Sequence, residues 1–188
     1  NPSGAVLSAD DLKTLQELAV QHDLIVLSDE VYERIIFDNI RHESVLHYPE
    51  LADRSIAVFS FGKTFHATGW KVGYAVAPPH LTTEIRKAHQ FVTFSVNTPV
   101  QLALAEYMTV PDHYLNLGTF YQKKRDYFLA GIKGSSFEPM ECHGSYFQSL
   151  SYKAISNLSD MQMAEELTKK HKVASVPVSA FYQDKTDN

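Results

Sequence analysis

Two short apolar runs in this sequence end in residues whose side chains can do acid–base or nucleophilic chemistry. The first run is followed by Asp29 and Tyr32, and the second leads into Ser60 and Lys63. Continuous apolar runs of this kind are typical of strands buried on both faces, as in a parallel sheet covered by helices. Ligands of such sheets bind beyond the carboxyl ends of the strands. We therefore expect the amine of Lys63 to lie close to Asp29, Tyr32 and the turn residue Asn1 around one concave site.

Each of these residues also has an ordinary explanation when it is taken alone. An aspartate that follows a strand often caps a helix, and a lysine is most often a solvated surface residue. Ser60 could cap a turn, and Tyr32 could simply pack against its neighbours. Their joint spacing, rather than any single residue, favours a shared site.

Helices and strands that would position these residues can be read from the apolar pattern. Ser8 precedes a run with apolar residues on one helical face and is a predicted N-cap. The run Val72–Ala77 follows Ser60 after eleven residues, too few for a helical crossover, so this strand is expected to be antiparallel or reached by an irregular loop. The other predicted strands are 24–27, 56–59, 137–140, 146–150 and 173–178, and the later predicted helices are 81–96, 99–108, 112–132 and 160–171.

Longer segments around the polar residues resemble the fold-type I aminotransferases. The segments are NPSG at 1–4, SDEVYE at 28–33, SFGKTFHATGWKVGY at 60–74 and FSVNTPVQLALAEYM at 94–108. They are most similar to the branch that includes methionine aminotransferases and kynurenine or glutamine transaminases, and the similarity runs across essentially the whole chain.

The resemblance implies an α/β fold in two parts. Residues 1–110 would form the second half of the large cofactor-binding domain, a mostly parallel sheet with helices. Residues 111–188 would form the interdomain helix and part of a small α+β domain. The chain has no initiating methionine and stops in a polar stretch, so we expect it to be a piece of a longer protein.

A site for pyridoxal 5′-phosphate (PLP) is implied as well. Lys63 would carry the cofactor as a Schiff base and, once a substrate has displaced it, move a proton between the substrate α-carbon and the cofactor. Asp29 would pair with the pyridine nitrogen and keep it protonated, so that the ring accepts electrons. A buried carboxylate is costly unless it is paired, and a pyridinium N–H is a fitting partner.

The remaining implied contacts hold the two ends of the cofactor. Tyr32 and Asn1 would hydrogen-bond the phenolic oxygen, and Ser60 and Lys71 would hold the phosphate. Many relatives carry arginine where Lys71 stands, and lysine offers a point charge without the bidentate fork. The similar branch also has Gly-Trp-Lys there.

Some parts of the family's site have no counterpart between the two ends of this sequence. The resemblance implies that a glycine-containing phosphate loop and an aromatic that stacks on the ring precede Asn1. The arginine that binds the substrate α-carboxylate would follow Asn188. Arg125 lies in the middle of a predicted helix and is expected on its solvated face. This chain alone is therefore expected to be unable to perform transamination.

The implied reaction moves the amino group of a methionine-like, aromatic or glutamine-like amino acid to a 2-oxo acid. One alternative is a PLP-dependent cysteine-S-conjugate β-lyase, which would release pyruvate without an added oxo acid. Another is a non-catalytic PLP-like regulatory module, although a pure scaffold would not need Asp29, Tyr32, Ser60 and Lys63 together. Family members are homodimers, which suggests a dimer contact at Phe94–Pro99; the alternative is that this segment fills the core.

Composition and charge agree with an ordinary globular protein. Hydrophobic residues make up 44% of the chain, charged residues 21%, and the net charge is −5, which gives no reason to expect nucleic acid or an acidic membrane as a partner. Cys142 is the only cysteine, so an intramolecular disulfide is impossible, and we expect a cytoplasmic protein. His42 and His47 are five residues apart, which would separate them on a helix and argues against a zinc site.

Overall fold

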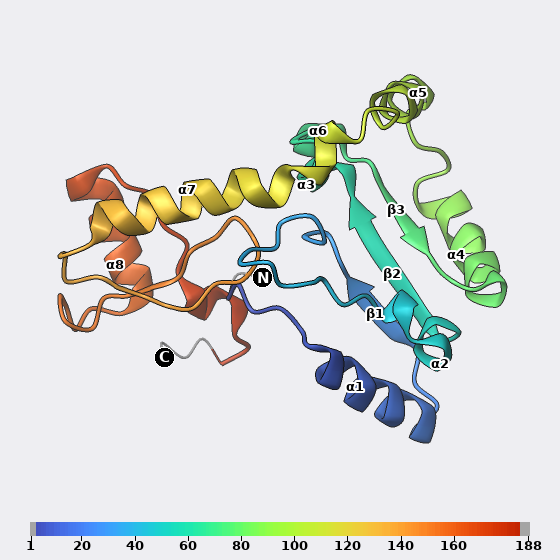
Figure 1. Ribbon diagram of the computed structural model, residues 1–188, viewed down its shortest axis with the longest axis horizontal. Helices are drawn as coiled ribbons and strands as arrows, with labels where there is room; N and C mark the ends of the chain where they lie inside the picture. The colour runs from blue at the N-terminus through green and yellow to red at the C-terminus, as the bar shows by residue number, and fades with distance from the viewer. Residues whose placement is uncertain (1–2, 185–188) are drawn as a thin grey trace.

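The computed structural model describes residues 3–184 of the chain (Figure 1). Its larger sheet has three strands in the order β1 (Val26–Asp29), β2 (Ser55–Ser60) and β3 (Gly73–Val76). Strand β1 runs parallel to β2, and β3 runs antiparallel to it. The antiparallel direction predicted from the short connection is thus confirmed, and the α/β class with it, although the sheet described is mixed rather than mostly parallel.

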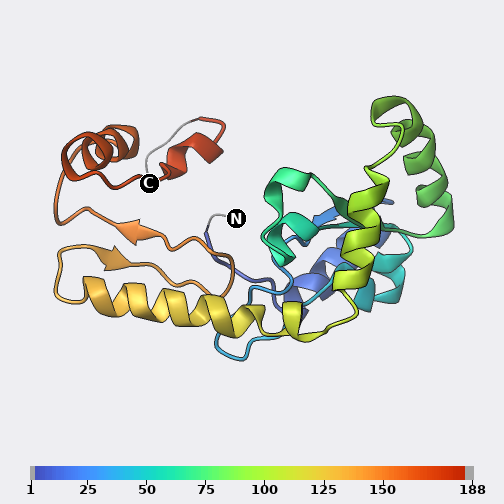
Figure 2. The ribbon, with the colours of Figure 1, turned by 90° about the horizontal axis from the view of Figure 1, so that it is seen from above.

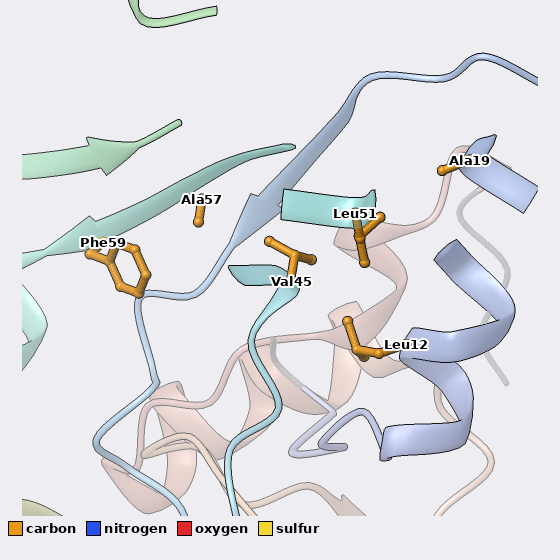
Figure 3. Close-up of a cluster of buried hydrophobic side chains, with 6 residues drawn as sticks. All are labelled: Leu12, Ala19, Val45, Leu51, Ala57 and Phe59. Atoms are coloured by element: carbon orange, nitrogen blue, oxygen red, sulfur yellow. The ribbon is translucent and has the colours of Figure 1, made fainter. Parts of the chain in front are cut away.

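One face of this sheet is covered by helix α1 (Ala9–Gln21) and the short helix α2 (Pro49–Ala52). Ser8 is the N-cap of α1, as predicted, and forms a capping box with Asp11. Alternate residues of β2 point toward the helices because side chains along a strand alternate between its two faces. Figure 3 shows the resulting core, made of Leu12, Ala19, Val45, Leu51, Ala57 and Phe59.

The opposite face of the sheet is open in the described chain, so the prediction of strands buried on both faces is wrong here. Leu27 is 71% exposed, and every residue of β3 is exposed. The physical reason is that α1 and α2 contribute to the same core and lie on the same side. Apolar residues on the other side have no comparable cover among residues 3–184.

The helical connections begin at the carboxyl end of β2. The connection between β2 and β3 contains the short helix α3 (Phe61–Thr64) and the 3₁₀ turn η2 (Thr68–Trp70). Helices α4 (Pro79–Val92) and α5 (Thr98–Tyr107) agree with the predicted helices apart from shifted ends. The predicted helix 112–132 is divided at Asn116 into α6 (Asp112–Leu115) and α7 (Leu117–Ile132). The first turn of α7 packs closely against the backbone of Ile36. A Cβ on Gly118 would lie 2.8 Å from the carbonyl oxygen of Ile36, so only glycine fits there without a shift.

A second, smaller lobe follows along α7. Strands β4 (Glu138–Pro139) and β5 (Leu150–Ser151) pair antiparallel, and Figure 2 shows this orange hairpin beside α7. Helix α8 (Asp160–Glu166) continues into a π-helical turn, η3 (Leu167–His171). Together they cover the helix predicted at 160–171.

The strand predicted at 173–178 is wrong. This segment joins neither sheet, and the 3₁₀ turn η4 (Val178–Phe181) takes up its end. The amide of Val173 donates instead to the carbonyl of Leu167, 3.1 Å away, which closes the preceding helical turn. An apolar, β-branched run becomes a strand only where a neighbouring strand can pair with it, and the described residues provide none.

None of the helices in residues 3–184 combines the length and the apolar character needed to cross a lipid bilayer.

Candidate active site

Asp29 and Ser60 leave the same face of the three-stranded sheet. Asp29 is the register partner of Val58 in the neighbouring parallel strand, and Ser60 stands two residues beyond Val58. Registered partners point to one face and side chains repeat with a period of two, so Asp29, Val58 and Ser60 share the open face. Both polar residues therefore lie at the carboxyl edge of the sheet, where ligands of such sheets bind.

The turn from β2 into α3 fixes the direction of the chain that carries Lys63. Ser60 caps α3, because its Oγ accepts a hydrogen bond from the amide of Gly62 at 3.2 Å. Thr68 donates its hydroxyl to the carbonyl of Gly62 at 3.0 Å. A Cβ on Gly62 would lie 2.9 Å from the Cα of Thr68, so any other residue would push these two segments apart.

The amine of Lys63 lies between two tyrosines. Its Nζ donates a hydrogen bond to the hydroxyl of Tyr146 at 2.5 Å. The same nitrogen lies 4.7 Å from the ring centroid of Tyr146 and 5.3 Å from that of Tyr32. The two rings meet edge to face with centroids 5.3 Å apart. The amine is thus held among phenol groups rather than free in solvent.

These phenols shift the acid–base behaviour of the lysine. Partial burial lowers the pKa of Lys63, but the hydrogen bond to Tyr146 and the nearby phenol of Tyr32 outweigh it, so the pKa lies above its usual value. The same hydrogen bond lowers the pKa of Tyr146. Burial, above all, raises the pKa of Tyr32.

The hydroxyl of Tyr32 is buried without a satisfied hydrogen bond. It approaches Lys63 and Tyr146, yet within residues 3–184 no partner meets it with good geometry. A buried polar group in this state costs free energy unless a ligand or water completes it. A phenolic oxygen of a bound cofactor next to Lys63 would fit this position.

Lys71 lies near Ser60 because of the pairing between β2 and β3. Ser60 is the register partner of Gly73, and the amide of Phe61 donates to the carbonyl of Val72 at 3.2 Å. Lys71 itself has a left-handed backbone, with φ at 55°, and an exposed side chain. No hydrogen bond or ion pair in the described part of the chain engages its amine. A serine hydroxyl and a free ammonium group near the start of α3 suit a phosphate.

A cavity of about 350 Å³ opens beside Tyr32. Asp29, Tyr32 and Gly4 belong to its wall, and Glu33 and Glu43 add negative charge. Tyr32 is the residue that both lines the cavity and contacts Lys63. One carboxylate oxygen of Asp29 accepts from the amide of Val31 at 3.3 Å, which orients the group.

The structure thus brings Tyr32 and Lys63 into contact and places Asp29 on the same sheet edge as Ser60, with Lys71 near Ser60. No contact joins Lys63 to Asp29 among the described residues, and Asn1 lies outside them. The roles assigned to these six residues stay predictions.

Arg125 corrects the expectation of a solvated helix face. Its side chain is only 13% exposed, and its guanidinium donates two hydrogen bonds of 2.7 Å to Asp38 and one of 2.9 Å to the carbonyl of Cys142. The guanidinium holds the pKa of Asp38 down at about 2, and Asp38 in turn raises the pKa of Arg125. The helical period could not show this, because Asp38 approaches α7 from a distant loop.

Tyr146 was missed as a site residue. It lies 83 residues beyond Lys63 in the sequence, in the turn between β4 and β5. The only local signal is the Gly144–Ser145 turn that precedes it, where Ser145 adopts a left-handed φ of 79°. A turn of that kind marks a constrained backbone but does not name the partner of the next side chain.

Comparison with protein families decides the identity of the fold. The model for aminotransferases of class I and II matches residues 1–187. The chain belongs to this family. It is 48% identical to a methionine aminotransferase of Escherichia coli (strain K12) over 98% of the chain and 48% of that protein. It is 35% identical to a kynurenine–oxoglutarate transaminase of Dictyostelium discoideum, over 98% of the chain and 47% of that protein.

Solved structures of the family have the same fold. The crystal structure of YbdL from Escherichia coli, identified as a methionine aminotransferase, matches with a TM-score of 0.94 and 48% identity, over 98% of this chain and 49% of that one. An aromatic aminotransferase from Pyrococcus horikoshii OT3 matches with a TM-score of 0.88 and 30% identity, over 97% and 50%. The chain spans about half the length of these relatives.

Proposed function

We propose that this chain supplies the lysine-bearing half of a PLP-dependent aminotransferase site. The observation that supports it most directly is the contact between Lys63 and Tyr32, whose buried hydroxyl has no well-aligned partner. An amine that can form a Schiff base therefore lies next to a hydroxyl that can bind the oxygen beside the cofactor's aldehyde. Because the chain belongs to the class I and II aminotransferases, PLP is the cofactor we propose for this position.

The other predicted site residues would hold this cofactor at its ring nitrogen, its phosphate and its phenolic oxygen. Asp29 would pair with the ring nitrogen, and Ser60 and Lys71 would hold the phosphate near the first turn of α3. Bound PLP would supply an electron-accepting ring for the bond changes at the substrate α-carbon. Lys63 would hold and return the proton at that carbon. Asn1 would add a second hydrogen bond at the phenolic oxygen.

The proposed substrates are an amino acid of methionine-like, aromatic or glutamine-like type and a 2-oxo acid as acceptor. The similar proteins support this choice, since their names include methionine and kynurenine–oxoglutarate transaminases. The cytoplasmic location predicted from the sequence is proposed together with this metabolic role.

We also propose that the protein is a homodimer and that Phe94–Pro99 lies at the dimer contact. The support is exposure: Phe94 is 79% exposed and Phe91, at the end of α4, is 86% exposed. The alternative that Phe94 fills the core does not agree with this exposure. Asn97 caps α5 by accepting from the amide of Val100 at 3.1 Å, so the loop leads into the helix in a fixed direction.

Reductive trapping tests the lysine assignment directly. The chain is mixed with PLP, reduced with borohydride and digested, and the modified peptide is identified by mass spectrometry. We expect the adduct on Lys63 and its loss in Lys63→Arg. Lys87→Arg is the matched control, because Lys87 is an exposed lysine paired with Glu84 and should not affect trapping. Equal adduct yield in wild type and Lys63→Arg, spread over surface lysines, would refute the proposal.

The reaction itself is tested by supplying amino acid and 2-oxo acid to the full-length protein. Formation of the new amino acid that depends on the oxo acid supports transamination. Pyruvate released from a cysteine S-conjugate without an added oxo acid would support the β-lyase instead. Retained turnover by residues 1–188 alone would show that the expectation of an inactive chain is wrong.

A further inference from the structure

Tyr146 is the residue that holds the amine of Lys63 in this structure. The ammonium group donates to its hydroxyl at 2.5 Å and lies 4.7 Å from the centre of its ring. The two residues come from different lobes, Lys63 from α3 beside the large sheet and Tyr146 from the turn between β4 and β5. Their contact therefore joins the lobes at the reactive nitrogen.

The backbone around Tyr146 is fixed by several hydrogen bonds. The amide of Ser145 donates to the carbonyl of Ile35 at 2.9 Å, and the buried thiol of Cys142 donates to the carbonyl of Gly144 at 3.1 Å. Ser145 itself is 5% exposed. The same Cys142 thiol lies 3.3 Å from the carbonyl oxygen of Phe147, so the backbone is tied down both before and after Tyr146.

Aromatic neighbours then fix the ring. Tyr32 meets it edge to face at 5.3 Å, Phe147 lies at 4.8 Å and Tyr121 at 6.0 Å between ring centroids. Within residues 3–184, the phenols of Tyr32 and Tyr146 act on the amine, and the phenol of Tyr121 is close enough to interact with its charge. The hydroxyl of Tyr121 is already bonded to Nδ1 of His66 at 3.2 Å. Tyr146 is thus the phenol whose hydroxyl accepts a well-aligned hydrogen bond from the amine of Lys63.

We propose that Tyr146 is a positioning residue of the lysine site, whose hydroxyl receives the ammonium group of Lys63 whenever that nitrogen carries no cofactor. This inference rests on the proposed function of Lys63 and extends it to the second lobe. An oxygen acceptor stabilises the charged form of the amine, whereas attack on an aldehyde requires the neutral form. Tyr146 would therefore retain the amine beside Tyr32 and slow its reaction with electrophiles near neutral pH.

Competitive labelling of the lysines in protein free of PLP tests this. Wild type and Tyr146→Phe are treated with trace acetic anhydride at a series of pH values, and the labelling of each lysine is measured by mass spectrometry. Loss of a charge-assisted hydrogen bond should raise the labelling of Lys63 near neutral pH by about threefold or more. The pH profile of Lys63 should move to lower pH, while the exposed Lys123 in the same digest stays unchanged.

Tyr121→Phe is the matched control, since it removes a hydroxyl from a neighbouring ring without touching the lysine. Labelling of Lys63 that is unchanged in Tyr146→Phe, with native circular dichroism, would overturn the proposal. An equal increase in Tyr121→Phe would also overturn it, because general loosening would then explain the effect.

A reciprocal measurement covers the case in which Tyr146→Phe does not fold. Removing the amine in Lys63→Met should shift the ionisation of a phenol to higher pH in an ultraviolet difference titration of tyrosinate. Identical titrations of wild type and Lys63→Met would contradict the proposal. Both measurements are made without PLP, so a failure to trap PLP on Lys63 would count against the proposed function and leave the contact with Tyr146 standing.

Discussion

The guanidinium of Arg125 joins helix α7 to a loop 87 residues away through two hydrogen bonds to Asp38. A third bond holds the carbonyl of Cys142, just before the turn that carries Tyr146. The guanidinium also lies 4.8 Å from the ring centroid of Phe37. One side chain thus supports both the loop that carries Asp38 and the backbone just before the turn between β4 and β5.

Asp38→Asn should make the unfolding free energy less dependent on pH. The pKa of Asp38 is about 2 in the folded chain, against about 3.9 when unfolded. A lowered pKa stabilises the fold above the unfolded value, and this contribution is lost as the pH falls toward the folded value. We expect the variant to be about 1 kcal/mol less stable above about pH 5, because the half-exposed pair is screened by solvent.

The comparison is made by urea unfolding at several pH values. The deficit of Asp38→Asn should shrink as the pH is lowered from about 4 to about 2. Asp53→Asn is the control, since Asp53 is exposed and the difference should be small at every pH. A deficit of Asp38→Asn that stays constant across the acid range would contradict the role given to Arg125.

Some site residues could be predicted from their local sequence, and others could not. Asp29, Ser60 and Lys63 follow apolar runs within a few residues, so local spacing was enough to single them out. Tyr146 and Asp38 act across 83 and 87 residues of chain, respectively. Neither residue type nor spacing near them encodes such a partner, because the contact is created by the way the two lobes meet.

Helix α1 provides a prediction at the scale of an element. The hydroxyl of Ser8 accepts from the amide of Asp11 at 3.2 Å, and the amide of Ser8 donates to the carboxylate of Asp11 at 2.8 Å. Ser8→Ala should lower the unfolding free energy by about 1 kcal/mol. The loss should appear in global unfolding, because Leu12 and Ala19 of this helix are part of the core under the sheet.

Ser8→Thr, which keeps the hydroxyl, should recover most of the stability in the same urea experiment. If Ser8→Ala and Ser8→Thr unfold at the same denaturant concentration, the capping box contributes less than its geometry suggests.

Elements were predictable where the signal is local. The cap at Ser8 and the direction of β3 depend on a few neighbouring residues, and both predictions were confirmed. The strand at 173–178 and the burial of the sheet on both faces depend on what packs alongside. Those predictions were wrong because the required partner strand and covering helices are not supplied by residues 3–184.

At the scale of the whole chain, residues 3–184 leave one face of the sheet open and expose aromatic side chains on α4 and on the loop that follows. Phe91 and Phe94 are 86% and 79% exposed. Such apolar surface promotes association. We therefore expect the chain to sediment as a multimer at high concentration.

Replacing both residues, in Phe91→Ser/Phe94→Ser, should weaken this association by roughly several hundredfold, because each buried phenylalanine contributes about 2 kcal/mol and every 1.4 kcal/mol is about tenfold. Tyr127→Ser is the control, since Tyr127 is a similarly exposed aromatic, at 83%, but lies on α7. A compact monomer of the wild-type chain at high concentration would contradict the prediction. Equal weakening by Tyr127→Ser would show that the contact is not specific to this surface.

The division into residues 1–110 and 111–188 stays a prediction, but the contacts across it are clear. Arg125 bonds to Asp38 on one side of the boundary and to Cys142 on its own side. Lys63 and Tyr146 meet across the same boundary. Any movement of one lobe relative to the other must either break these contacts or keep the contacting residues together.

The single thiol of the chain lies next to these contacts, because the carbonyl of Cys142 accepts a hydrogen bond from Arg125. Cys142 is 6% exposed, and a Cβ on Gly4 would lie 2.5 Å from its sulfur, so the amino-terminal segment covers it directly. The amide of His143 donates to the carbonyl of Gly4 at 2.9 Å and holds that cover in place. Burial, first of all, raises the pKa of the thiol, which keeps it protonated and unreactive.

The reaction rate of Cys142 therefore reports how often the segment that covers it opens. A thiol reagent should modify it only during excursions that lift the Gly4 segment, about a hundredfold or more slowly than in denaturant. Where the segment recloses faster than the reagent reacts, the protection factor obtained in this way is the reciprocal of the equilibrium constant for opening. Arg125→Lys loses the guanidinium that bonds both Asp38 and the carbonyl of Cys142. We expect this variant to speed the thiol reaction in the absence of denaturant by a larger factor than its change in global unfolding free energy would predict.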